Sequence, residues 1–274
     1  MQTPVRVPDF KERKRRGEKI AMLTAYDATM ARLLDRAGVD ALLVGDSVGM
    51  VMLGHDTTIP VTLDDMVHHT RAVARGALRA LVIADMPFLT FQTGVEEAVR
   101  NAGRLIQEGG AAAIKLEGGR AVLDVVRRLV EVGIPVMGHL GLLPQSVNQI
   151  GGYRKQATKP AEAEALLADA RMLEEAGAFA LVLESIPPDL AGAVTAAVSI
   201  PTIGIGAGPD CDGQVLVSHD MLGLFDGFVP SFVKQYAHLS ETVVAAARAY
   251  VDEVRDSQFP ASPNSVADVH RSGR

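Results

Sequence analysis

The sequence predicts a (β/α)8 barrel, because short apolar segments typical of strands alternate with amphipathic helical segments along nearly the whole chain. The length of 274 residues suits one such domain, which typically takes about 250 residues. Several apolar segments also end in acidic residues, as at Asp46, Asp85 and Glu184. The alternative, an open doubly wound sheet, gathers its ligand groups mainly at one crevice, whereas a barrel brings all eight strand ends to one mouth. The number of polar strand ends therefore favours the barrel.

The elements follow in order from this alternation. Residues 1–17 are polar and are expected to be loosely structured. The eight expected strands are residues 20–25, 42–44, 81–84, 112–116, 134–139, 180–183, 201–205 and 214–217. The expected helices are residues 27–37, capped by Asp27, 62–74, capped by Thr62, 93–108, 122–132, 161–176, a helix opened by residues 187–189, and 241–254. No helix separates the last two strands, which is a departure from simple alternation. We expect one domain over residues 1–258 and a disordered tail, rich in Pro, Ser and Asp, over residues 259–274.

Composition excludes several classes of function. The net charge of −6 argues against nucleic-acid binding, and the one basic run, residues 11–16, is expected to be a solvated segment before the first strand. Cys211 is the sole cysteine, so no intrachain disulfide can form and a reducing cytoplasm fits. No signal peptide is recognisable, and no segment approaches the roughly 18 apolar residues of a membrane span. We therefore expect a cytoplasmic protein with neither a nucleic-acid nor a membrane partner.

Three acidic residues at strand ends are candidate metal ligands. Asp46, Asp85 and Glu117 each follow a run of apolar residues, so a barrel would bring their carboxyl groups to the same end. Three hard oxygen ligands suit Mg²⁺, which keeps open positions for a chelating substrate. Each residue alone could equally cap the next helix. The lack of a Cys/His ligand set argues against zinc.

Lys115 and Glu117 are two residues apart, so a strand would point both side chains to one face, inward if Ile114 and Leu116 face the helices. The lysine could bind a substrate carboxylate, form a plain ion pair with the glutamate, or form a Schiff base. Glu184 follows an apolar strand, where burial raises a carboxyl pKa and makes a candidate base. The alternative is a salt-bridged or capping glutamate.

Other polar residues at strand ends have weaker signatures. Ser47 lacks a G-x-S-x-G setting, so we expect a hydrogen-bond donor rather than a nucleophile. His139 could be a hydrogen-bonded residue of the wall or a ligand. The glycines of residues 204–208 do not have dinucleotide-binding spacing, because Pro209 stands where the third glycine should be.

A set of ordered motifs covers about residues 15–258. The motifs are Thr24-Ala25-Tyr26-Asp27, Val44-Gly45-Asp46-Ser47-Val48-Gly49-Met50, Gly54-His55-Asp56, Pro60-Val61-Thr62, Ala84-Asp85-Met86-Pro87-Phe88, Lys115-Leu116-Glu117-Gly118-Gly119, Gly138-His139-Leu140-Gly141, Pro144-Gln145-Ser146-Val147-Asn148, Gly151-Gly152-Tyr153 and Gly204-Ile205-Gly206-Ala207-Gly208. In these motifs the chain closely resembles the ketopantoate hydroxymethyltransferase (3-methyl-2-oxobutanoate hydroxymethyltransferase) family.

The resemblance implies a TIM barrel of the phosphoenolpyruvate/pyruvate superfamily and a cytoplasmic enzyme of pantothenate synthesis, typically a homodecamer. It implies transfer of a hydroxymethyl group from 5,10-methylenetetrahydrofolate to 3-methyl-2-oxobutanoate through an Mg²⁺-stabilised enolate, giving 2-dehydropantoate and tetrahydrofolate. The implied metal ligands are Asp46, Asp85 and Glu117, and the implied proton acceptor is Glu184. The candidate substrate-binding residues are Asp46, Ser47, Asp85, Lys115 and His139.

Two other functions fit parts of the same pattern. One is a different Mg²⁺-dependent 2-oxo-acid enzyme of the superfamily, such as a lyase or a phosphonomutase, which the metal and lysine residues alone do not exclude. The other is a non-catalytic barrel that binds a metabolite. The intact set of acidic residues and lysine argues against this second possibility, because loss of function would be expected to remove such residues while sparing the fold.

Overall fold

The computed structural model describes residues 3–225 and 227–261. Eight parallel strands pair in chain order, and β1 pairs with both β2 and β8, so the sheet closes into a barrel. The strands are β1 (Ile20–Thr24), β2 (Ala41–Val44), β3 (Leu81–Asp85), β4 (Ala113–Glu117), β5 (Val136–Gly141), β6 (Ala180–Glu184), β7 (Thr202–Ile205) and β8 (Gly213–Leu216). The predicted fold class is confirmed, and every expected strand is present within two residues of its expected bounds.

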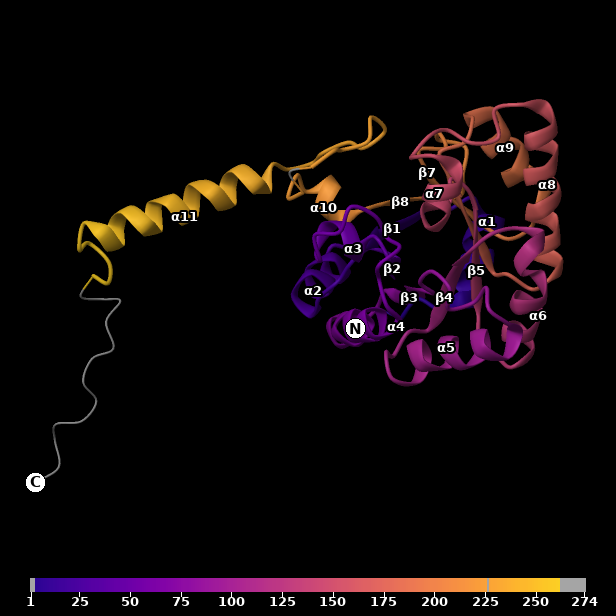
Figure 1. The fold of residues 1–274 in the computed structure, drawn as a ribbon, viewed down its shortest axis with the longest axis horizontal. Helices are drawn as coiled ribbons and strands as arrows, with labels where there is room; N and C mark the ends of the chain where they lie inside the picture. The colour runs from indigo at the N-terminus through magenta and orange to yellow at the C-terminus, as the bar shows by residue number, and fades with distance from the viewer. Residues whose placement is uncertain (1–2, 226, 262–274) are drawn as a thin grey trace, which may run out of the picture. The chain divides into compact units, whose positions relative to one another are not determined.

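Helices surround the barrel, as Figure 1 shows for α4 to α9. The long ones are α2 (Ala28–Arg36), α4 (Leu63–Gly76), α5 (Val95–Gln107), α6 (Leu123–Glu131), α8 (Pro160–Glu175) and α9 (Pro188–Ala197). The predicted caps are confirmed: Asp27 accepts hydrogen bonds from the backbone N–H groups of Thr29 and Met30, and Thr62 forms a capping box with Asp65. As expected, no helix separates β7 from β8.

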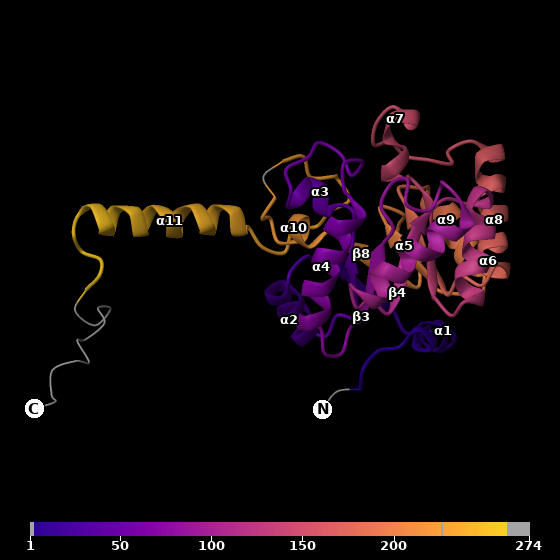
Figure 2. The same cartoon turned by 60° about the horizontal axis from the view of Figure 1, so that its bottom comes forward.

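Short helical turns, which the sequence did not predict, lie in the connections. They are α3 (Val48–Val51), η1 (Arg120–Val122), η2 (Pro144–Ser146) and α7 (Val147–Ile150). Figure 2 shows α3 and α7 at one end of the barrel. Because α3 follows β2, and η2 and α7 follow β5, this is the end at which the strands finish, where barrel enzymes carry their active sites.

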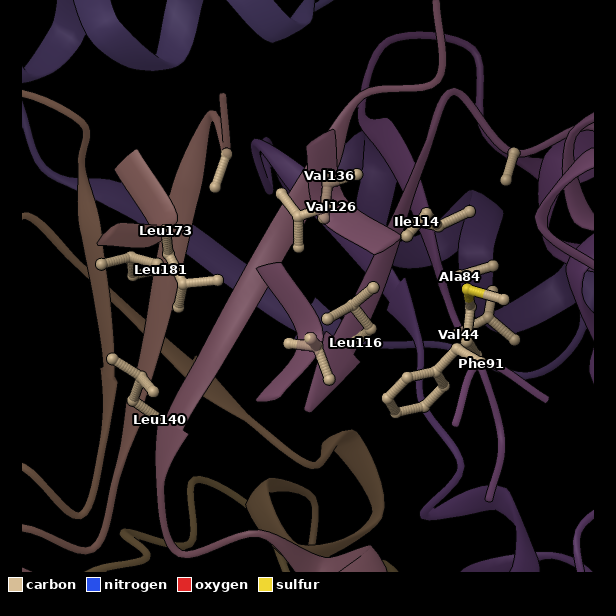
Figure 3. Close-up of a cluster of buried hydrophobic side chains, with 14 of the residues drawn as sticks. Val44, Ala84, Phe91, Ile114, Leu116, Val126, Val136, Leu140, Leu173 and Leu181 are labelled. Atoms are coloured by element: carbon tan, nitrogen blue, oxygen red, sulfur yellow. The ribbon is translucent and has the colours of Figure 1, made fainter. Parts of the chain in front are cut away.

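Alternating residues of each strand build two apolar layers. Along β4, Ile114 and Leu116 pack outward against helical residues such as Val126, as Figure 3 shows, whereas Ala113 belongs to a separate cluster inside the barrel. Lys115 shares the inward direction of Ala113. The predicted orientation of β4 is therefore confirmed.

The expectation that residues 1–17 are loosely structured is wrong, because helix α1 (Val7–Arg16) occupies most of this segment. Asp9 accepts a hydrogen bond from the backbone N–H of Arg6 and so caps the first turn. Phe10 is fully buried with the inner barrel cluster and meets Phe179 edge to face at 5.5 Å. In Figure 2 α1 lies at the end of the barrel opposite α7, so the helix covers the bottom of the barrel.

The basic run is also more than a solvated segment. The ammonium group of Lys14 lies 2.9 Å from Asp212 and donates to the backbone oxygens of Thr195 and Ile200, and Arg13 pairs with Asp40 at 2.9 Å. Two of its cations therefore bind the bottom of the barrel. Charged residues with a single large apolar side chain resemble a solvated segment in sequence. Only the partners of Arg13 and Lys14, which lie in α9 and in the loops before β2, β7 and β8, reveal the role of the helix.

Residues up to Ser218 form one compact unit, and the described residues from His219 onward form a second. The bounds of α10 are Ser218–Met221, and α11, expected over residues 241–254, spans Leu239–Arg255 with no buried residue. Phe259 packs edge to face on Tyr250. Most of the expected disordered tail, residues 262–274, lies outside the described residues, and the expectation of one domain through residue 258 stays a prediction. No helix in the described part of the chain is long and apolar enough to cross a membrane.

Candidate active site

The carboxyl ends of the strands bring most of the predicted site residues together. The parallel register places Asp85 of β3 beside Lys115 of β4, and Glu117 of β4 beside His139 of β5. Glu184 ends β6 beside Gly141 of β5. Residues distant in sequence thus become neighbours through strand pairing alone.

Lys115 lies at the centre of this cluster. Its ammonium nitrogen is 2.9 Å from Oδ1 of Asp85 and 3.3 Å from Nδ1 of His139. The Lys115 side chain is 5% exposed, so its positive charge is withdrawn from water and depends on these partners. Burial opposes the charged form, but the carboxyl groups of Asp85, Glu117 and Asp46 outweigh it and raise the pKa of Lys115. The lysine is therefore a fixed cation and not the neutral amine that a Schiff base needs.

His139 connects Lys115 to Glu184. An ammonium group can only donate, so Nδ1 of His139 accepts from Lys115 and the imidazole proton lies on Nε2. Nε2 in turn faces Oε2 of Glu184 at 3.1 Å. Burial and the charge of Lys115 hold the pKa of His139 well below its usual value, so the ring stays neutral.

The acidic residues have strongly perturbed pKa values. Burial raises the pKa of Glu184 to about 7, although Lys115 pulls it back. Burial and repulsion by Asp85 raise the pKa of Asp46 to about 7, and burial with repulsion by Asp46 raises the pKa of Glu117 well above its usual value. One lysine therefore does not compensate the negative charge gathered at this mouth.

The donor chemistry of the site fits Mg²⁺. Asp46, Asp85 and Glu117 supply hard oxygen ligands, and Oε1 of Glu117 is buried and accepts no hydrogen bond within the described structure. A cation would relieve the repulsion that, together with burial, raises the pKa values of Asp46 and Glu117. As they stand, no three His, Cys, Asp or Glu side chains of residues 3–225 and 227–261 converge closely enough to hold an ion. Lys115 pairs with Asp85, and the amide of Gln145 bonds to Asp46.

Ser47 lies at the same mouth, beside Asp46. Its hydroxyl is 2.8 Å from the hydroxyl of Tyr26, a buried residue that sequence reasoning missed as a member of the site. At Gly45, just before Asp46, an added Cβ would come within 2.8 Å of the Ser47 hydroxyl oxygen. Any other residue at this position would require the Ser47 hydroxyl to move.

Gln145 is the second residue that sequence reasoning missed. It lies in η2, and its side-chain amide donates to Oδ2 of Asp46 at 2.8 Å and to the backbone oxygen of Met86 at 2.9 Å. Its backbone N–H donates to Oε2 of Glu117 at 3.1 Å. The only signal in the sequence was its place in the motif of residues 144–148, because Asp46, Met86 and Glu117, its three partners, are all far from it in the chain.

Comparison with known proteins relates the chain to a family. The family model described as ketopantoate hydroxymethyltransferase matches residues 4–262. The 3-methyl-2-oxobutanoate hydroxymethyltransferase of Moorella thermoacetica is 61% identical over 95% of this chain and 97% of its own length. The protein of the same name from Syntrophus aciditrophicus is 57% identical over 92% of this chain and 93% of its own length.

Solved structures share the fold at much lower sequence identity. The 2,3-dimethylmalate lyase, a member of the PEP mutase/isocitrate lyase superfamily, superimposes with a TM-score of 0.59 at 18% identity, covering 99% of this chain and 92% of the other. Phosphonopyruvate hydrolase in complex with oxalate and Mg²⁺ superimposes with a TM-score of 0.62 at 14% identity, covering 95% and 93%. The barrel is thus of the type found in this superfamily, and the sequence matches are specific: the chain is an enzyme of the ketopantoate hydroxymethyltransferase family.

Proposed function

We propose that the chain transfers a one-carbon unit from 5,10-methylenetetrahydrofolate to 3-methyl-2-oxobutanoate, giving 2-dehydropantoate and tetrahydrofolate in the pantothenate pathway. The observation that carries the proposal is the cluster of Asp46, Asp85 and Glu117 beside Lys115, with Glu184 nearby at the same mouth. The names of the relatives supply the substrate. In balance, the C3–H bond of the oxo acid and the two bonds from the one-carbon unit to N5 and N10 of folate break. A C–C bond forms from C3 to the one-carbon unit, and water supplies the hydroxyl group. The proton from C3 and one proton of water end on the two nitrogens of tetrahydrofolate.

Glu184 is the proton acceptor in this proposal. Its pKa of about 7 suits a base that must take a weakly acidic proton next to a carbonyl and release it again near neutral pH. His139 faces the same carboxyl group, with Nε2 3.1 Å from Oε2 of Glu184.

Asp46, Asp85 and Glu117 would hold Mg²⁺, and Lys115 would balance the carboxylate of the oxo acid. The bound ion would polarise the 2-oxo group and stabilise the negative charge that develops as C3 loses its proton. Asp46, Ser47, Asp85, Lys115 and His139 line the place that the oxo acid would occupy. Ser47, held by Tyr26, would donate a hydrogen bond to it.

Three further expectations belong to the same proposal. The enzyme would act in the cytoplasm, in keeping with its free thiol, Cys211. It would be a homo-oligomer, with ten subunits implied by the resemblance, because α11 exposes apolar side chains along its whole length. Its partners would be the two small substrates, and neither nucleic acid nor a membrane.

Release of tetrahydrofolate tests the proposed reaction. We expect release that needs both substrates, stops in excess chelator and returns when Mg²⁺ is added. The analogue 3,3-dimethyl-2-oxobutanoate, which has no hydrogen on C3, should give none. A 2-oxo-acid lyase would instead cleave its substrate without folate, and full turnover in excess chelator would contradict the metal assignment.

A further inference from the structure

Gln145 contacts two of the three candidate metal ligands at once. Its side-chain nitrogen lies between Oδ2 of Asp46 and the backbone oxygen of Met86, so both amide protons are used. The backbone oxygen of Met86 can only accept, so it fixes which end of the amide faces these two oxygens. The residue is 5% exposed, and a lost bond would therefore not be replaced readily by bulk water.

The backbone of Gln145 contacts a second candidate metal ligand, Glu117. Its N–H donates to Oε2 of Glu117 at 3.1 Å, while Oε1 of the same carboxyl group accepts no hydrogen bond in the described structure. One oxygen of Glu117 is thus fixed by a backbone hydrogen bond, and the other oxygen accepts no hydrogen bond from the described residues. A carboxylate held in this way is oriented before a cation arrives.

The local fold places Gln145 at this position. At Gly141 the backbone turns with a φ of +97°, and an added Cβ would meet the backbone oxygen of Glu184. Leu142 then donates to that oxygen at 2.9 Å, and η2 begins at Pro144. Residues 141–142 therefore contact the end of β6, and η2, which follows them, places Gln145 at the carboxyl ends of β2 and β4.

We propose that Gln145 is a positioning residue that orients Asp46 and Glu117 for the divalent cation. This inference rests on the proposed function, since that function assigns both carboxyl groups to the metal. Gln145 does not touch the reacting atoms. It acts through the ligands, as hydrogen-bond partners of metal ligands commonly do, where their loss weakens metal binding by about 10- to 100-fold.

The test is a calorimetric titration of the metal-stripped full chain with MgCl₂ alone. We expect Gln145→Met, which keeps the length of the side chain but has no amide, to bind Mg²⁺ about 10- to 100-fold more weakly than the unaltered chain. Gln156→Met is the matched control, because the side-chain amide of Gln156 lies in the same connection and donates to the backbone oxygen of Arg154 and, among the described residues, to no carboxyl group. This control should bind Mg²⁺ as the unaltered chain does.

Thermal melting in chelator separates positioning from folding. If Gln145→Met does not fold, Gln145→Asn, which keeps both amide protons one methylene further back, should fold and still bind Mg²⁺ more weakly. Equal affinity of a folded Gln145 variant and the unaltered chain would overturn the inference alone. Failure of the unaltered chain to bind Mg²⁺ would overturn both the inference and the metal assignment of the proposed function.

Discussion

At the scale of single residues, Glu184 combines two properties that a base needs. It lies 3.1 Å from His139 of the buried cluster, and its side chain is only 16% exposed, so water stabilises its charge less than that of a fully exposed carboxylate. We predict that Glu184→Gln slows exchange of the C3 proton of 3-methyl-2-oxobutanoate for deuterium by about 10²- to 10⁴-fold, the usual worth of a positioned base. NMR measures the exchange without folate. Glu164→Gln, on the exposed side of α8, should leave the rate unchanged, and an unchanged rate in Glu184→Gln would move the base elsewhere.

The same residue predicts the pH dependence of the exchange. Burial raises the pKa of Glu184 to about 7, and only the carboxylate form can accept a proton. The rate should therefore fall about tenfold for each pH unit below 7 and level off above it. Rate profiles in deuterated buffer between pH 5 and pH 9 check this. A profile that stays flat down to pH 5 would show that the base titrates at the ordinary pKa of a carboxyl group.

Sequence reasoning reached some of these residues and missed others for a physical reason. Lys115 and Glu117 were predictable as inward neighbours, because the period of two along a strand is local information. Gln145 was not, since its amide partners Asp46 and Met86 are 99 and 59 positions away in the chain. Tyr26 was missed in the same way, because its bond to Ser47 depends on β1 and β2 being neighbours in the barrel.

At the scale of elements, α1 contributes a hydrophobic plug at the end of the barrel away from the site. We predict that Phe10→Ala lowers the free energy of unfolding by about 3–5 kcal/mol, because it removes a fully buried ring from the inner cluster. Urea denaturation measures the change. Lys11→Ala, on the exposed side of the same helix, should stay within about 0.5 kcal/mol of the unaltered chain. Equal stability of the two variants would mean that α1 does not stabilise the barrel.

The elements also differ in how far sequence could predict them. The strands and the long helices were predictable because their apolar periods of 2 and 3.6 are read directly from neighbouring residues. For α1 no apolar period could be recognised, since most of its length is charged. Phe179 and Asp212, the partners of Phe10 and Lys14, lie far away in the chain, just before β6 and β8. Short turns such as η2 are determined by tertiary contacts like those of Gln145. Such turns are too short to show an apolar periodicity in the sequence.

At the scale of the whole molecule, α11 exposes an apolar face within the described part of the chain. Val243, Tyr250 and Val254 lie on one face by helical spacing, and each is at least 43% exposed. A helix of 17 residues with no buried side chain gains little stability on its own, because most helical stability in proteins comes from packing of an apolar face. A second copy of the chain would supply that packing in the proposed homo-oligomer.

We predict that Val243→Glu together with Val254→Glu shifts the full chain to smaller assemblies, because the double variant places two charges in the apolar face of α11 where a subunit contact would bury them. Analytical ultracentrifugation over a range of protein concentrations measures the mass. Ala245→Glu adds one negative charge to the opposite face of α11 and should leave the assembly intact. If the double variant keeps the mass of the unaltered chain, subunits do not meet through this face of α11, and if the unaltered chain is itself a monomer, the proposed oligomer is wrong.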